Sequence, residues 1–135
     1  MTTSATRPKP ALVLCIEDDQ VALQVRKLLL GSVGYEVLTA SSAEQGLEVL
    51  RDHPVDLVIA DHFLRAKTGT EIAREMKQLK PKVPILIVSA MVEEPAGIEF
   101  TDGFLPKGEA PDVLLGAVAC LLKRRFATGP SQLLS

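Results

Sequence analysis

The chain has 135 residues, of which 47% are hydrophobic and 24% charged, and its formal net charge is −2. This length suits one domain with a buried core and leaves no room for a second. The charge balance disfavours nucleic-acid binding, and no apolar run approaches the ~18 residues that cross a membrane, so we expect neither nucleic acid nor membrane as a partner.

The two ends of the chain differ in composition from the part between them. Residues 1–10 are rich in Thr, Ser and Pro without a secretory apolar stretch, and predict a flexible arm. Residues 127–135 contain a Gly-Pro pair and predict a tail, which leaves 11–126 as the folded domain. Cys15 and Cys120 lie in separate apolar runs without metal-ligand spacing, so we expect buried reduced thiols and a cytoplasmic protein.

Strand-like and helix-like segments alternate in the first half of the domain. Residues 11–16 form a continuous apolar run typical of a buried strand, and residues 36–40 form the next strand. Ser41 and Glu44 have the spacing of a capping box and predict the start of the second helix. The apolar positions expected to pack are Val21, Ala22, Val25, Leu28 and Leu29 in the first helix, and Ala43, Leu47 and Leu50 in the second.

The alternation continues in the second half. Strands are expected at 55–60, 84–90 and 103–106; Thr68 with Glu71 predicts a capping box, and Pro111 suits the first turn of the last helix. The apolar faces expected there are Ile72, Ala73, Met76 and Leu79, then Leu114, Ala117, Val118, Leu121 and Leu122.

The segment 91–103 breaks this pattern. A helix belongs between the fourth and fifth strands, but Pro95 and Gly97 disfavour one and the apolar residues form no stripe. We therefore expect a shortened or irregular fourth helix, and partners that dock elsewhere or order this segment on binding.

Five β-α units with continuous apolar strands predict an α/β fold, in which helices cover both faces of a parallel sheet. Among the topologies with right-handed crossovers, we expect the flavodoxin-like doubly wound order 2-1-3-4-5.

Polar side chains follow the predicted strands at the sheet edge where such folds bind ligands. They are Glu17, Asp18 and Asp19 after the first strand, Asp61 after the third, Ser89 after the fourth and Lys107 after the fifth. Phosphoryl transfer to a carboxylate needs this set: carboxylates for a hard cation, a lysine for a phosphoryl oxygen and a hydroxyl for another.

Four motifs in this order, VLCIEDD (13–19), VDLVIAD (55–61), ILIVSA (85–90) and FLPKG (104–108), resemble those of response-regulator receiver domains. The resemblance spans residues 11 to about 125. It implies Asp61 as the phospho-acceptor, and Mg²⁺ or Mn²⁺ held by Glu17, Asp18, Asp61 and the backbone carbonyl of Phe63.

The resemblance also implies roles for residues near the acceptor. Ser89 corresponds to the switch hydroxyl, Ala90 to the small residue after it, Lys107 to the lysine, and Phe104 to the aromatic residue whose rotamer reports phosphorylation. Gly69 corresponds to the glycine eight residues beyond the acceptor. Phe63 and Met91 occupy the positions, two beyond the acceptor and two beyond the hydroxyl, that influence attack by water.

The sequence departs from the family pattern at three positions. Arg65 stands where the family has proline, Lys67 where it has an apolar residue, and Gly108 replaces the proline after the lysine. We expect a basic loop after the acceptor and no cis peptide after Lys107.

The expected function is phosphoryl acceptance on Asp61 from a histidine kinase or histidine phosphotransfer protein, read by an unknown downstream protein. Without an output domain in this chain, signalling would proceed by protein contact or onward phosphotransfer. Two alternatives stay open: an interaction module independent of phosphorylation, and an aspartate-nucleophile phosphohydrolase. The second is disfavoured because Phe63 stands where those enzymes carry a second Asp.

Overall fold

A computed structural model describes residues 9–127 of the chain. The expected arm at residues 1–10 and tail at 127–135 therefore fall almost wholly outside the described residues.

The centre of the domain is a parallel sheet of five strands in the order β2-β1-β3-β4-β5, which confirms the predicted topology. Cys15 on β1 pairs with Thr39 on one side and Ile59 on the other, so β1 and β3 form the middle of the sheet. The strands are β1 (Leu12–Ile16), β2 (Glu36–Ala40), β3 (Leu57–Asp61), β4 (Ile85–Ser89) and β5 (Gly103–Pro106).

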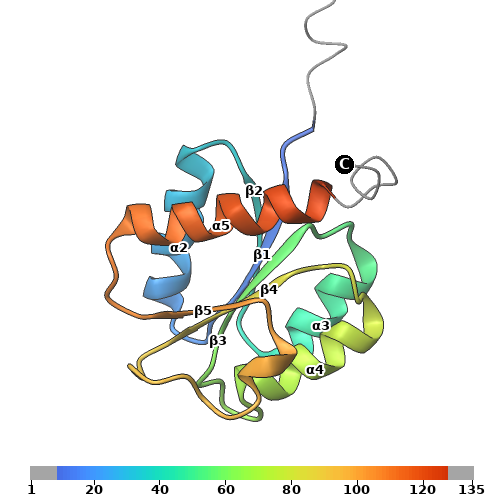
Figure 1. Ribbon diagram of the computed structural model, residues 1–135, viewed down its shortest axis with the longest axis vertical. Helices are drawn as coiled ribbons and strands as arrows, with labels where there is room; N and C mark the ends of the chain where they lie inside the picture. The colour runs from blue at the N-terminus through green and yellow to red at the C-terminus, as the bar shows by residue number, and fades with distance from the viewer. Residues whose placement is uncertain (1–8, 128–135) are drawn as a thin grey trace, which may run out of the picture.

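Within residues 9–127, four α-helices cover the sheet, two on each face (Figure 1). The helices α2 and α5 lie on one face, and α3 and α4 lie on the other. Their bounds are Gln20–Ser32 for α2, Ala43–Asp52 for α3, Gly69–Leu79 for α4 and Pro111–Phe126 for α5. In residues 9–127 no helix combines the length and apolar character needed to cross a membrane.

The two faces of the sheet build two apolar cores because successive strand side chains point in opposite directions. On β1, Val13 and Cys15 pack with α2 and α5, whereas Leu14 and Ile16 pack with α3 and α4. Continuous apolar strands are needed because both faces are covered.

The buried face of α2 differs from the one expected. Val21, Val25 and Leu28 are 73%, 59% and 73% exposed, and the buried positions are Leu23, Arg26 and Leu30. Both sets recur at helical spacing, so periodicity alone could not choose between them. The expected stripe was wrong because an arginine occupies the middle of the true one.

The start of α3 also differs by one residue from the expected Ser41–Glu44 pair. Ser42 is the N-cap, and its Oγ accepts a hydrogen bond from the Gln45 backbone N–H at 3.1 Å. The Gln45 side chain in turn accepts from the Ser41 N–H at 2.8 Å. By contrast, the predicted capping box of Thr68 and Glu71 at the start of α4 is confirmed.

Both cysteines are free thiols, but only one is buried. Cys15 lies inside the sheet, whereas Cys120 lies on the exposed side of α5 beside the buried Leu121. The expectation that both are buried was therefore wrong for Cys120, because that position of α5 points away from the core.

Between β4 and β5 the chain forms a single 3₁₀ turn, η1 (Ile98–Phe100), and no regular helix. Gly97, at the start of the turn, has φ +88°, a left-handed conformation that ends any helix. This confirms the expectation that the helix between the fourth and fifth strands is shortened or irregular.

Candidate functional site

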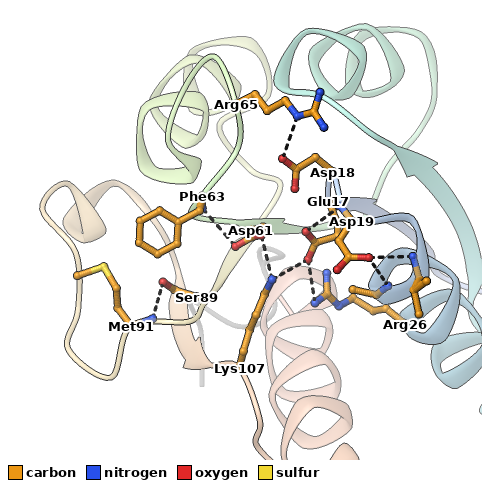
Figure 2. A network of polar contacts seen from close by, with 12 residues as sticks. Glu17, Asp18, Asp19, Arg26, Asp61, Phe63, Arg65, Ser89, Met91 and Lys107 are labelled. Carbon is orange, nitrogen blue, oxygen red and sulfur yellow. Dashed lines mark hydrogen bonds and ion pairs between the residues drawn. The ribbon is translucent and has the colours of Figure 1, made fainter.

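Three carboxylates meet at the carboxyl edge of the sheet. Glu17 and Asp18 follow β1 directly, and Asp61 is the last residue of the neighbouring strand β3. One oxygen from each lies within 4.8 Å of the other two. The predicted acidic cluster therefore forms without any long loop to position it (Figure 2).

Lys107, at the end of β5, joins two of these carboxylates. Its Nζ lies 3.0 Å from Asp61 Oδ2 and 3.0 Å from Glu17 Oε1. Asp61 and Glu17 are buried, at 3% and 1% exposed, so little water reaches the two pairs. Lys107 partly offsets the repulsion between two anions that the fold places side by side.

The close approach of these charges shifts the pKa values of Glu17 and Lys107. Burial, and then the neighbouring Asp61 carboxylate, raise the pKa of Glu17 above its usual range. Burial alone would lower the pKa of Lys107, but its contacts with Asp61 and Glu17 outweigh that effect and raise it. The site thus holds more negative charge than its one bridging lysine compensates.

Ser89 lies at the end of β4, beside β3, and is fully buried. Its Oγ accepts a hydrogen bond from the Met91 backbone N–H at 3.1 Å, which leaves the hydroxyl proton available to a further acceptor. The next residue, Ala90, is exposed and small. The Ser89 carbonyl accepts from the Lys107 N–H at 2.6 Å, which ties the ends of β4 and β5 together.

The chain after Asp61 turns closely around the acceptor. The Phe63 N–H donates to Asp61 Oδ1 at 3.2 Å, and the Gly69 N–H donates to the His62 carbonyl at 2.7 Å. A Cβ at Gly69 would lie 2.5 Å from the Asp61 carbonyl oxygen, so only glycine fits there. Gly69 therefore brings the start of α4 against the acceptor.

Phe104 lies on β5, half-buried against the core shared with α3 and α4. Its expected role in reporting phosphorylation stays a prediction. At Gly108 φ is +93°, which proline cannot adopt, and the described residues contain no cis peptide bond, as expected.

The basic residues after the acceptor contact acidic neighbours. Arg65 is 91% exposed, with its Nε 3.8 Å from Asp18 Oδ2, and Lys67 pairs with Glu75 on α4. The exposed Arg65 pair is weakened by solvent and contributes little to stability.

Two buried polar residues beside the site were not predicted to take part. Arg26 on α2 is 9% exposed and contacts Glu17, while His62 follows the acceptor and is 7% exposed. Arg26 could have been suspected from its helical spacing to Leu23 and Leu30. For His62 the sequence carries no such signal, because strand ends are polar in many proteins.

The donor atoms of the acidic cluster fit a hard divalent cation. Mg²⁺ prefers carboxylate oxygens together with phosphate oxygen and water, and the crowding that raises the pKa of Glu17 is relieved by positive charge. No histidine or cysteine belongs to this cluster, so its chemistry does not resemble a zinc site.

Comparison with known proteins agrees with this geometry. The family model for the response regulator receiver domain matches residues 13–119. The transcriptional regulatory protein GlrR of Escherichia coli (strain K12) is 35% identical over 114 residues, 82% of this chain and 26% of GlrR. The cell cycle response regulator CtrA of Brucella ovis is 30% identical over 116 residues, 83% of this chain and 50% of CtrA.

Solved structures show the same fold. A CheY-like receiver domain protein from Methanospirillum hungatei superposes with a TM-score of 0.83 at 25% identity, covering 89% of this chain and 99% of that one. The response regulator TrrA of Thermotoga maritima, in complex with Mg²⁺-BeF, gives 0.78 at 26% identity, covering 82% and 98%.

The chain spans about a quarter of GlrR and half of CtrA. It belongs to the response regulator receiver domain family, the phospho-acceptor domains of two-component signal transduction.

Proposed function

We propose that Asp61 accepts a phosphoryl group in a reaction that depends on a divalent cation. The observation that carries this proposal is the buried Asp61 carboxylate, which shares one edge of the sheet with Glu17, Asp18 and Lys107. In the reaction an Asp61 carboxylate oxygen attacks phosphorus, and the bond from phosphorus to the donor's leaving atom breaks. The leaving atom takes the electron pair with it.

The chain's own groups compensate the charge that arrives with the phosphoryl group. Lys107, already 3.0 Å from Asp61, neutralises one phosphoryl oxygen. The Ser89 hydroxyl, whose oxygen accepts a hydrogen bond from the Met91 N–H, donates a hydrogen bond to a second oxygen. The exposed Ala90 leaves the approach to Asp61 open.

Glu17, Asp18 and Asp61, with the backbone carbonyl of Phe63, would hold Mg²⁺ or Mn²⁺, which offsets the repulsion between the carboxylate and the incoming phosphoryl group. Before the phosphoryl group arrives, the pairing of Glu17 with Lys107 offsets part of the remaining negative charge.

The phosphoryl donor is a histidine kinase or a histidine phosphotransfer protein, and the phosphorylated domain is read by a downstream protein. Membership of the receiver family supports both partner classes. A ligand shifts a two-state equilibrium only by its differential affinity for the two states, so the new contacts of Lys107 and Ser89 must favour one conformation.

The test is incorporation of phosphoryl from acetyl phosphate across a series of Mg²⁺ concentrations. We expect no incorporation without Mg²⁺, and for Asp18→Asn a curve shifted at least ~10-fold towards higher Mg²⁺, because one carboxylate ligand is lost. Asp52→Asn, an exposed charge at the end of α3, is the matched control and should follow wild type.

Two results would contradict the proposal. One is incorporation that is unaffected by removal of Mg²⁺. The other is no incorporation under any condition, which would favour an interaction module independent of phosphorylation.

A further inference from the structure

Arg26 is the one charged residue on the buried stripe of α2. It lies between Leu23 and Leu30 in that stripe and is only 9% exposed. Arginine is almost never buried this far unless it is paired, because the charge loses its water. An aliphatic side chain at this position would need no countercharge, so the charge of Arg26 needs a separate explanation.

The partner of Arg26 is Glu17 of the acidic cluster. Arg26 Nη2 lies 3.8 Å from Glu17 Oε1, the same oxygen that Lys107 Nζ approaches at 3.0 Å. Figure 2 shows the two cations reaching Glu17 from different elements, α2 and the end of β5. Glu17 therefore has two countercharges, whereas Asp61 shares one of them.

The two countercharges differ in what else they contact. Lys107 also pairs with Asp61 at 3.0 Å, and its side chain is 34% exposed. Arg26 is fixed on a helix, and its Nη1 has no hydrogen-bond partner within the described part of the chain. Among the residues that the structure describes, Arg26 forms an ion pair with Glu17 alone, whereas Lys107 is shared between two carboxylates.

Phosphorylation would give Lys107 a new anionic partner. A phosphoryl group adds about two negative charges beside Asp61 and draws Lys107 towards its oxygens. Glu17, at 1% exposed, would then lose the nearer of its two side-chain cations, with little water to replace it, and Arg26 would be left to orient it towards the divalent cation.

We propose that Arg26 is a positioning residue for Glu17, which keeps that carboxylate paired and oriented when Lys107 turns to the phosphoryl group. This role rests on the proposed function. Arg26 would therefore act in the phosphorylated state and would add little to the stability of the fold, since buried ion pairs contribute little to folding compared with apolar replacements.

The test compares two affinities in each variant: Mg²⁺ alone, and beryllium fluoride at saturating Mg²⁺, both followed by NMR titration. Beryllium fluoride imitates the phosphoryl group and needs no donor. For Arg26→Met we expect the dissociation constant for beryllium fluoride to rise at least ~10-fold, and that for Mg²⁺ alone to change less than ~3-fold. The second change is small because Lys107 still contacts Glu17 when no phosphoryl group is present.

Three further variants sharpen the comparison. Arg26→Lys keeps the charge and should restore beryllium fluoride binding to within ~3-fold of wild type. Arg26→Gln keeps the polar contact without the charge, should behave like Arg26→Met, and replaces it if that variant does not fold. Lys27→Met removes an exposed charge from the next position of α2 and should have no effect.

The outcomes separate this role from the proposed function. If wild type binds beryllium fluoride but Arg26→Met and Arg26→Gln bind it equally well, the role of Arg26 is wrong and the proposed function stands. An equal loss of affinity for Mg²⁺ and for beryllium fluoride would also overturn it, because that indicates general distortion. If wild type binds no beryllium fluoride, both are overturned.

Discussion

At the scale of single residues, the side chains that flank Asp61 should govern how long a phosphoryl group survives. Phe63 and Met91 both lie to the left of Asp61 in Figure 2, and they are 49% and 36% exposed. Hydrolysis needs a water molecule oriented in line with the phosphorus–oxygen bond, and neither apolar side chain can hold one by a hydrogen bond.

We therefore predict slow loss of the phosphoryl group, with a half-life of minutes or longer after the donor is removed. Phe63→Gln places an amide where it can orient water and should shorten the half-life by ~10-fold or more. Val92→Gln, an equally polar change at a position 84% exposed, is the control. A wild-type half-life of seconds in the absence of any phosphatase would contradict the prediction.

A second residue-scale feature is the buried His62. Burial lowers the pKa of its imidazole, although the carboxylates of Asp61 and Glu71 act in the opposite direction. Its Nδ1 is buried without a hydrogen-bond partner in the described residues. The folded protein therefore favours neutral His62 more strongly than the unfolded chain does.

This difference predicts how stability depends on pH. Between the lowered folded pKa and the usual value of about 6.5, the unfolded chain binds more protons, so the free energy of unfolding falls as pH falls through that window. His62→Leu removes this part of the pH dependence and should add about 1 kcal/mol, because a buried unpaired polar atom is lost.

The pH dependence of stability is measured by urea unfolding at about pH 7.5 and about pH 5.5, which lie on either side of the usual pKa of histidine. His53→Gln, which changes the chain's other histidine at an exposed position, is the matched control. The interpretation fails if His62→Leu loses as much stability on acidification as wild type does.

At the scale of elements, the segment between β4 and β5 is attached along one stripe of α4. Residues 96–102 run beside the helix, in orange next to α4 in Figure 1. The three contacts are Thr70 Oγ1 to the Ala96 carbonyl at 2.9 Å, the Arg74 guanidinium 4.8 Å from the Phe100 ring centroid, and Lys77 Nζ to Asp102 Oδ2 at 2.7 Å. The segment is therefore irregular, but these contacts attach it to α4.

Gly97 makes this attachment possible. Its φ of +88° is strained for other residues, and a Cβ there would lie 3.0 Å from Thr70 Cβ. We predict that Gly97→Ala destabilises the protein by about 1–2 kcal/mol and speeds amide exchange in residues 96–102. The measurements are chemical unfolding and hydrogen exchange.

Gly31→Ala is the matched control, because it lies within α2 and a Cβ there would contact nothing within 4 Å. It should stabilise the protein by roughly 0.5–1 kcal/mol, since alanine favours helix over glycine. Equal effects of the two substitutions would show that the backbone at Gly97 is not strained.

The elements also show where sequence reasoning is strong and where it fails. Strands at 36–40 and 103–106 were predicted to the residue, because a short stretch with apolar residues in an alternating β-α pattern has few other interpretations. The buried stripe of α2 was not predicted correctly, because Val21, Val25 and Leu28 recur at helical spacing yet face solvent.

At the scale of the whole molecule, topology explains why the acidic site could be located from sequence. Residues that end neighbouring parallel strands must meet at one edge, so the pairing of β1 with β3 brings Asp61 beside Glu17. Lys107 follows β5 at the same edge, two strands away from β3, and its long side chain reaches both carboxylates. Arg26 reaches the same edge from a helix face, and its position depends on how α2 rotates on the sheet. The residues at strand ends do not indicate how α2 is rotated on the sheet.

Three apolar residues of α2 face solvent instead of the core. Val21, Val25 and Leu28 were expected to complete the core, and instead they form an apolar part of the surface. The core is complete without them because Leu23 and Leu30 fill the space between α2 and the sheet.

The most direct test of the central claim is the intact mass of the protein after treatment with acetyl phosphate and Mg²⁺. We predict that wild type gains the mass of one phosphoryl group, and that Asp61→Asn gains none because an amide is no nucleophile for this transfer. Asp56→Asn, which changes another partly buried carboxylate of the same β3 region, should be labelled like wild type. Undiminished labelling of Asp61→Asn would show that the phosphoryl group resides elsewhere and would contradict the account.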